Sequence, residues 1–221
     1  MSTAPRAVLF DLDGTLADRA ASLQRYSVML HSEFERALAP CSPGDVFAAL
    51  GAADDFGSQT QADALHGLLP WRKPVGSGVL FAHWHECFGE ACTAFDDVAT
   101  VIAALSARGI AMGIITNGSS GMQRAKIEAL GLEPAMAVIA VSGELGVEKP
   151  ERAIFDHALA AIGRRADEAW FVGDHPALDV AGASDAGLTA FWVKTGAALG
   201  AAREPKRVLA RLGELLSYLP A

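Results

Sequence analysis

Continuous apolar runs recur along the chain and are separated by longer stretches of mixed polarity. Short runs that lack polar alternation are typical of strands buried on both faces, as in a parallel sheet. The pattern therefore predicts β-strands over Ala7–Phe10, Ile110–Ile115, Ala137–Val141, Ala169–Val172 and Thr189–Val193.

The segments between the later runs have the length and spacing of helices. Val98, Ile102 and Leu105 form one apolar stripe, and Ile127 and Leu130 belong to another. A third stripe consists of Ile154, Phe155, Ala158, Leu159 and Ile162. Strands that alternate with helices predict βαβ units, so the expected fold class is α/β, a doubly wound, Rossmann-like parallel sheet.

The interval from about Asp18 to about Thr93 contains no convincing strand and is expected to be helical. Its first apolar face steps by three or four residues through Leu23, Tyr26, Leu30, Phe34 and Leu38. Further helices are expected from Pro43, over Phe56–Leu69, and after a loop at Pro70–Gly78. The predicted division is an α/β domain of residues 1–17 and 94–221, with a smaller all-helical domain of residues 18–93. A closing helix is expected over Pro205–Leu219, with Val208, Leu209, Leu212, Leu215 and Leu216 facing inward.

Composition narrows the class of protein. The chain has 221 residues, 51% of them hydrophobic and 20% charged, and a formal net charge of −8. That charge argues against nucleic-acid and anionic-membrane partners, although a metal and a lysine can still create an anion site locally. The three cysteines, Cys41, Cys87 and Cys92, lack framework spacing and are expected to be reduced thiols. The first apolar run is too short for a signal peptide or membrane span, so the expected location is cytoplasmic.

Polar residues that suit phosphoryl chemistry follow the predicted strands. Asp11 and Asp13 follow the first run, Thr116 and Asn117 the second, Lys149 the third, and Asp174 and Asp179 the fourth. Ligands of open parallel sheets bind at the carboxyl ends of strands, so these side chains are expected at one edge of the sheet. Carboxylates are hard oxygen ligands suited to Mg²⁺. Asp11 could attack phosphorus, Asp13 could act as general acid and base, and Thr116 and Lys149 could neutralise phosphoryl oxygens.

The same segments resemble the four signature motifs of the haloacid dehalogenase superfamily, in order and at similar spacing. They are Asp11–Thr15, Thr116-Asn117, Lys149-Pro150 and Gly173–Asp179. The helical interval resembles the superfamily's cap inserted between the first two motifs. The resemblance implies that Asp11 is nucleophile and metal ligand, and that Asp13 binds metal through its backbone carbonyl. It also implies that Asp174 is a ligand, and that Asp179 either supports the metal or orients Lys149. We expect Thr116, Asn117, Lys149 and Arg19 to bind the substrate.

Several of these residues could instead have purely structural roles. Asn117 could simply cap a helix that starts near Ser119, and Asp179 could be an exposed helix acid. The run His83–Cys87 with Cys92 matches no common zinc spacing, so packing or surface roles are preferred there.

The predicted activity is a Mg²⁺-dependent phosphomonoesterase that acts on a small organic phosphate. A halide leaving group needs no proton, so Asp13 favours phosphoryl transfer over dehalogenation. The alternatives are a phosphomutase and a non-catalytic protein that binds a phosphate ligand. Arg19, Arg72, His83 and His85 are candidates for selecting the leaving group. The sequence leaves the substrate, the pathway and the oligomeric state open.

Overall fold

The computed structural model of the chain describes residues 4–38, 40–54, 58–195, 205 and 207–220. The described residues divide into two compact units. The core unit takes its residues from 1–18, 94–123 and 131–221. The helical unit takes its residues from 19–93 and 124–130, so it also contains most of a helix from the second half of the chain.

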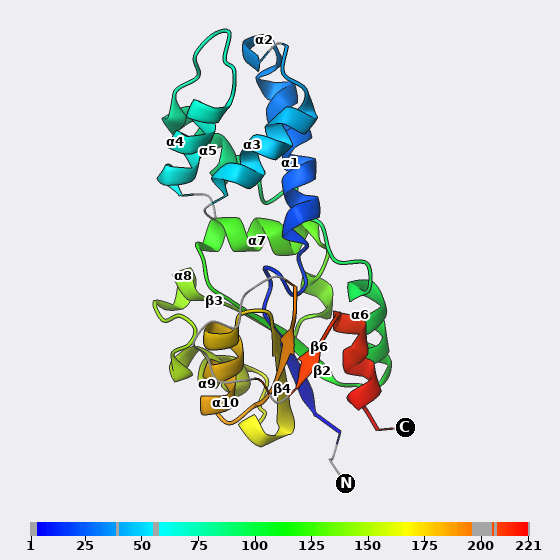
Figure 1. Cartoon of the computed structure of the whole chain (residues 1–221). Helices are drawn as coiled ribbons and strands as arrows, with labels where there is room; N and C mark the ends of the chain where they lie inside the picture. Colours follow the sequence, from blue (N-terminus) through cyan, green and yellow to red (C-terminus); the bar gives the residue numbers. More distant parts are fainter. Residues whose placement is uncertain (1–3, 39, 55–57, 196–204, 206, 221) are drawn as a thin grey trace. The chain divides into compact units, whose positions relative to one another are not determined.

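The core unit is built on a parallel sheet, as the apolar runs predict. The strands are β1 (Ala7–Phe10), β2 (Ala111–Thr116), β3 (Val138–Val141), β4 (Ala169–Gly173), β5 (Thr189–Val193) and β6 (Val208–Leu209). All neighbours pair in parallel, in the order β3-β2-β1-β4-β5-β6 (Figure 1). The doubly wound α/β prediction is therefore confirmed. Phe10 lies beside Ile114 and Val172, so β1, β2 and β4 end at one edge of the sheet.

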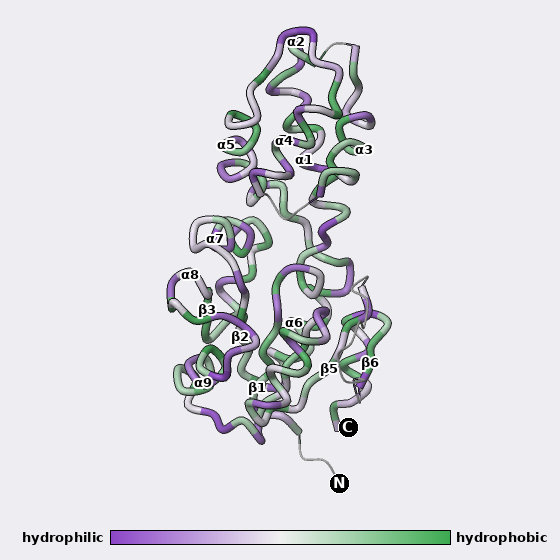
Figure 2. The backbone as a smooth tube through the Cα atoms, turned by 60° about the vertical axis from the view of Figure 1, so that its left-hand side comes forward, coloured by the Kyte–Doolittle hydropathy of each residue, from purple (hydrophilic) through white to green (hydrophobic). Residues whose placement is uncertain are grey.

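Helices cover both faces of this sheet. On one face, α9 (Arg152–Ala161) packs with α10 (Gly182–Asp185) against alternate strand residues. The ring of Phe155 meets Phe171 edge-on, with centroids 5.3 Å apart. On the other face lie α6 (Val98–Ala107) and η4 (Leu212–Tyr218), a 3₁₀ segment, which contact each other (Figure 1). Shorter elements complete the core unit: η1 (Glu133–Ala135), α8 (Ser142–Leu145), η2 (Ala166–Glu168) and the π-helical η3 (Pro176–Ala181). Figure 2 shows the sheet strands largely in green, as their apolar composition requires.

The helical unit has no strand among its described residues, as predicted for this interval. Its helices are α1 (Arg19–Glu33), α2 (Glu35–Leu38), α3 (Pro43–Ala53), α4 (Gln59–Leu68) and α5 (Ser77–Cys87). The start of α3 at Pro43 follows from a capping box: Asp45 N–H donates to Ser42 Oγ, and Ser42 N–H donates to the Asp45 carboxylate. Helix α4 begins after the predicted Phe56, which lies outside the described residues.

The predicted apolar face of the first helix is largely buried. Tyr26 of α1 packs edge-on against Trp84 and Phe88, which helps to form the centre of the unit. Phe34 is half-buried and lies between α1, which ends at Glu33, and a separate helix, α2. One further helix, α7 (Ser120–Ala129), carries residues of both units.

The predicted C-terminal helix over Pro205–Leu219 is wrong. Val208–Leu209 forms β6 beside Trp192 and Val193, and a 3₁₀ segment follows from Leu212. Strand pairing satisfies the backbone groups at this edge of the sheet, which an apolar pattern alone does not reveal. Of the residues expected to face inward, Leu209, Leu212 and Leu215 are buried. Val208 is exposed and Leu216 is half-buried.

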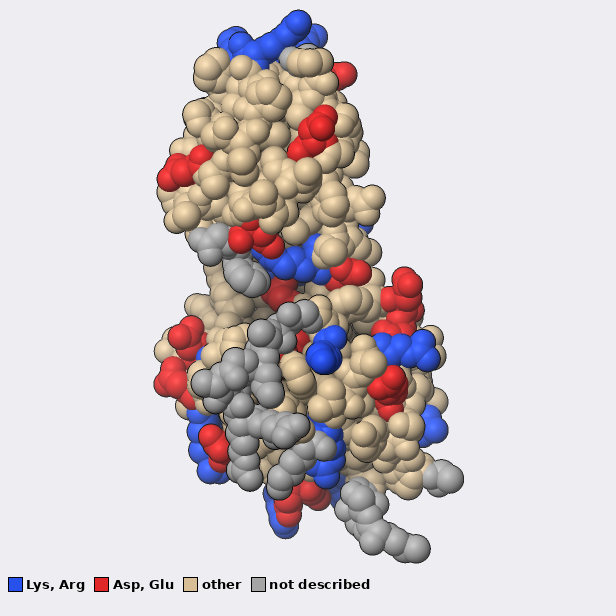
Figure 3. Space-filling view, in the orientation of Figure 1, with Lys and Arg blue, Asp and Glu red and all other residues tan. Residues whose placement is uncertain are grey.

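Charged side chains of both signs are dispersed over the visible face of the core unit (Figure 3). At the α2 end of the helical unit the visible charges are mainly basic (Figure 3), and Arg36 and Arg72 are exposed there. None of the helices in the described part of the chain is long and apolar enough to cross a membrane.

The two residues of β6 provide a test of this correction. Leu209 is 0% and Val208 is 44% exposed, because successive strand residues point to opposite faces. We expect Leu209→Ala to lower the free energy of unfolding by about 2–5 kcal/mol. The matched Val208→Ala is expected to lower it by about 0.5 kcal/mol or less. Urea unfolding measures both. Similar losses in the two variants would contradict the strand and favour a helix that buries both residues.

Candidate active site

The structure brings the predicted acids and lysine together in the core unit. Asp11 directly follows β1, Thr116 ends β2, and Asp174 directly follows β4. Asp179 lies in η3, and Lys149 lies in the loop between α8 and α9. The parallel register explains the convergence, since these strands end at the same edge of the sheet.

Lys149 joins two carboxylates in a buried ion-pair cluster. Its Nζ lies 2.5 Å from Asp11 Oδ1 and 2.7 Å from Asp179 Oδ1. All three residues are buried. The other oxygen of Asp179 accepts a hydrogen bond of 2.9 Å from the His175 backbone N–H. Of the two roles that the sequence left open for Asp179, the direct contact favours orienting Lys149.

The pKa values of two acids of the site, Asp11 and Asp174, are raised. Burial raises the pKa of Asp11 well above its usual range; Lys149 opposes that rise, and the charges of Asp179 and Asp174 add to it. Burial, with Asp179, raises the pKa of Asp174 to about 7. Burial alone would lower the pKa of Lys149, but Asp11 and Asp179 hold it above its usual range. One lysine therefore does not offset all the negative charge of the cluster.

The donor set fits a divalent cation. Carboxylate oxygens of Asp11, Asp174 and Asp179 lie within 4.8 Å of one another. Such hard oxygen donors are those that Mg²⁺ prefers. Gly14 leaves room for one of them: its φ of +82° suits glycine, and an added Cβ would overlap the Asp174 carboxylate. Among the described residues, no other group of acids, histidines and cysteines is close enough together to hold a metal ion. The residues of the His83–Cys92 region form no such group.

Asn117 ties the loop after β2 to the loop that carries the lysine. Its Nδ2–H donates to Lys149 O at 3.0 Å, and its Oδ1 accepts from Lys149 N–H at 2.9 Å. Both polar atoms of the amide therefore hold Lys149 in place. These contacts give Asn117 a positioning role, and its predicted substrate contact stays a prediction.

Four polar contacts at the site are not predicted by the sequence pattern. Thr15 Oγ1 donates to Asp11 Oδ2 at 3.4 Å, and Ser142 Oγ accepts from Gly118 N–H at 3.0 Å. Gln123 of α7 donates to Asp13 and Thr116. A signal for Gln123 existed, because it precedes Ile127 by four residues and so falls on the apolar stripe of its helix.

The candidate residues of the helical unit make contacts within that unit. Arg19 donates to both carboxylate oxygens of Asp54. His83 Nδ1 lies 2.8 Å from Tyr26 Oη, and the His85 ring packs on Phe81 with centroids 4.3 Å apart. The substrate contact of Arg19 stays a prediction.

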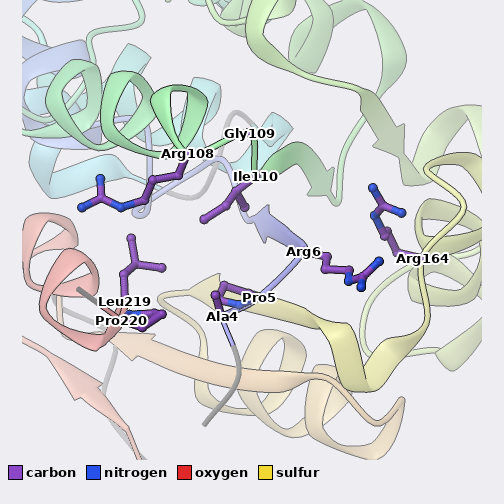
Figure 4. A pocket seen from close by; sticks show the side chains of 9 residues that line it. All are labelled: Ala4, Pro5, Arg6, Arg108, Gly109, Ile110, Arg164, Leu219 and Pro220. Atoms are coloured by element: carbon purple, nitrogen blue, oxygen red, sulfur yellow. The ribbon is translucent and has the colours of Figure 1, made fainter.

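A cavity of about 620 Å³ lies in the core unit (Figure 4). It is lined by Arg6 and Ile110, which directly precede β1 and β2, and by Arg108 and Arg164. It therefore lies at the amino ends of those strands, whereas Asp11 and Thr116 lie at their carboxyl ends.

Removal of the buried lysine charge gives a pH-dependent test of the cluster. We expect Lys149→Met to lower the free energy of unfolding by about 3–5 kcal/mol at pH 8 in EDTA, because buried carboxylates lose their partner. An acid whose folded pKa is raised stabilises the fold at low pH and loses that contribution as pH rises through the folded pKa. The deficit against wild type should therefore shrink towards pH 5. Urea unfolding at both pH values measures it, and a deficit that grows on acidification would contradict the cluster.

A model of the haloacid dehalogenase-like hydrolase family matches residues 5–187. The chain is 32% identical to a phosphoglycolate phosphatase of Rhodospirillum rubrum over 97% of this chain and 87% of that protein. It is 38% identical to a phosphoserine phosphatase of Thermus thermophilus, but that match spans only 46% of this chain and 41% of the relative.

The fold also matches a solved structure. The HAD-hydrolase YfnB of Bacillus subtilis, bound to magnesium, superposes with a TM-score of 0.72 at 21% identity, over 97% of this chain and 98% of that one. The motifs, the parallel sheet with its helical insertion between β1 and β2, and the family match agree. The chain belongs to the haloacid dehalogenase-like hydrolase family and is a hydrolase of its phosphatase type.

Proposed function

We propose that this chain hydrolyses a small phosphate monoester with Mg²⁺, through a phosphoryl group carried on Asp11. The observation that carries the proposal is the buried cluster in which Asp11 contacts Lys149 and lies close to Asp174 and Asp179. Buried carboxylates at this spacing repel one another, so a site of this kind is suited to a cation and an anionic substrate. Asp11, Asp174 and the backbone carbonyl of Asp13 would hold the metal. Bound Mg²⁺ would supply positive charge that offsets repulsion between the carboxylate and the phosphate.

In the first step, an Asp11 carboxylate oxygen attacks phosphorus and the bond between phosphorus and the ester oxygen breaks. The leaving alkoxide takes a proton from Asp13 and departs as an alcohol. Lys149 and Thr116 bind the phosphoryl oxygens, whose charge they neutralise in the transition state.

In the second step, water attacks the phosphorus of the aspartyl-phosphate. Asp13, now ionised, takes the proton of that water, and the bond between phosphorus and Asp11 breaks. Inorganic phosphate forms, and both carboxyl groups return to their starting protonation states. Splitting one displacement into two lets the same acid serve both the leaving group and the water.

We also propose that residues 18–93 act as the cap domain and select the leaving group, with Arg19 as a candidate contact. Some of the curated relatives are named for phosphoglycolate or phosphoserine, both small phosphomonoesters that bear a carboxylate, and others are named for glyceraldehyde 3-phosphate and pyrimidine 5'-nucleotides. Phosphoglycolate and phosphoserine are the first substrates to test.

Metal binding should stabilise the protein, and more so at higher pH. The pKa of Asp174 is raised to about 7 in the metal-free site, so protons compete with Mg²⁺ below that pH. We expect the Mg²⁺-induced rise in Tm to be small at pH 5.5 and larger at pH 8, and to be lost in Asp174→Asn. Thermal unfolding with Mg²⁺ or EDTA measures it. A pH-independent shift that survives in the variant would assign the metal to other residues.

Asp11→Asn should abolish turnover while the fold is kept. An amide is a poor nucleophile, so we expect release of inorganic phosphate to fall at least about 10³-fold. The assay uses p-nitrophenyl phosphate, phosphoglycolate and phosphoserine, with Mg²⁺ and with EDTA. Activity above a few per cent of wild type in a clean preparation would show that the nucleophile is misassigned.

A further inference from the structure

Gln123 is a buried amide that links two groups of the proposed reaction. It lies in α7, is 2% exposed, and belongs to the core unit. Its Nε2 lies 2.9 Å from Asp13 Oδ2 and 2.6 Å from Thr116 Oγ1. An amide nitrogen carries two hydrogens, so it can donate to both acceptors at once.

The orientation of this amide suits Asp13 in both of its protonation states. Gln123 directs its nitrogen at Asp13; an ionised carboxylate accepts on either oxygen, and a protonated one still accepts on its carbonyl oxygen. The backbone also restricts the side chain. A Cβ added at Gly118, whose φ is +142°, would lie 3.0 Å from Gln123 Cδ, so the loop after β2 runs close against the amide. A buried amide that lost these bonds would be destabilising, which keeps them in place.

We infer, on the basis of the proposed function, that Gln123 is a positioning residue that fixes the Asp13 carboxylate for proton transfer to the leaving group and anchors the Thr116 hydroxyl beside it. Its two hydrogen bonds set the distance between the general acid at β1 and the phosphoryl-binding hydroxyl at the end of β2. Proton transfer in the first step needs the donor oxygen within hydrogen-bond reach of the leaving oxygen. A misplacement of about 1 Å can cost about 100-fold in rate.

The neutrality of the side chain is part of this role. The nearby cation Lys149 binds Asp11 and Asp179. An amide can orient Asp13 by hydrogen bonding without adding a full charge to an acid that must both give and take a proton.

The test compares an alkyl phosphate with p-nitrophenyl phosphate in Gln123→Met, which keeps the length of the side chain but cannot donate. For this two-step reaction kcat/KM reports the steps up to departure of the leaving group, and p-nitrophenolate leaves without help from an acid. We expect kcat/KM for the alkyl ester to fall about 10- to 100-fold, and at least about 10-fold more than for p-nitrophenyl phosphate. When Gln123→Met is combined with Asp13→Asn, it should no longer lower kcat/KM for the alkyl ester much more than for p-nitrophenyl phosphate.

Equal losses for the two esters, or a full additional loss on top of Asp13→Asn, would overturn the inference. The matched control is Glu128→Met, an exposed position of the same helix, which should leave both esters unchanged. If Gln123→Met does not fold, Gln123→Asn keeps the amide but withdraws its nitrogen by one methylene, and the same comparison applies.

The Asp13→Asn enzyme separates this inference from the proposed function. If Asp13→Asn itself shows no dependence on the leaving group, the acid role of Asp13 fails. If Asp13→Asn shows that dependence and Gln123→Met does not, only the role of Gln123 fails.

Discussion

The ion pair between Lys149 and Asp11 is the interaction on which the rest of the site depends. A carboxylate as deeply buried as Asp11 is costly, and Asp179 and Asp174 nearby raise its pKa further. Lys149 offsets part of this charge while it leaves the cluster short of positive charge. The shortfall is what makes the site receptive to a cation. A fully neutralised cluster would be more stable but would attract a cation less strongly.

The sheet makes this arrangement possible by bringing distant segments to one edge. Lys149 lies 138 residues from Asp11 in the sequence, and Asp179 lies still further along. β1 is an inner strand, flanked by β2 and β4, so the residue that follows it meets side chains from both sides. Close packing then dictates small residues. Gly14 admits the Asp174 carboxylate, and a Cβ at Gly173 would overlap Asp179. Both glycines are therefore explained by space beside an acid.

Much of this structure could be predicted from the sequence, and the exceptions have a common physical cause. The apolar runs gave the first five strands because burial on both faces imposes a continuous pattern on each strand by itself. β6 was not predicted because Val208 and Leu209 also fit the apolar stripe of a helix. Only the pairing with β5 distinguishes the strand from a helix. The acids of the site followed from their positions after strands. Gln123 and the partners of Asn117 were not predicted, because the role of an amide depends on which groups its oxygen and nitrogen contact, and the partners of both amides lie on other elements.

In the proposed reaction, two kinds of polar residue therefore support the same chemistry in different ways. Lys149 acts through charge, so its effect reaches Asp11 and Asp179 together and depends on pH. Gln123 and Asn117 act through directional hydrogen bonds, since an amide fixes the position of its partner without changing the net charge of the site. A catalytic carboxylate that only had to attack could be controlled by charge alone. One that must deliver a proton and then accept another has to keep its position through both steps, and hydrogen bonds from the buried Gln123 side chain serve that purpose. The same reasoning explains why a polar residue occupies an inward position of α7, where packing alone would favour an apolar one.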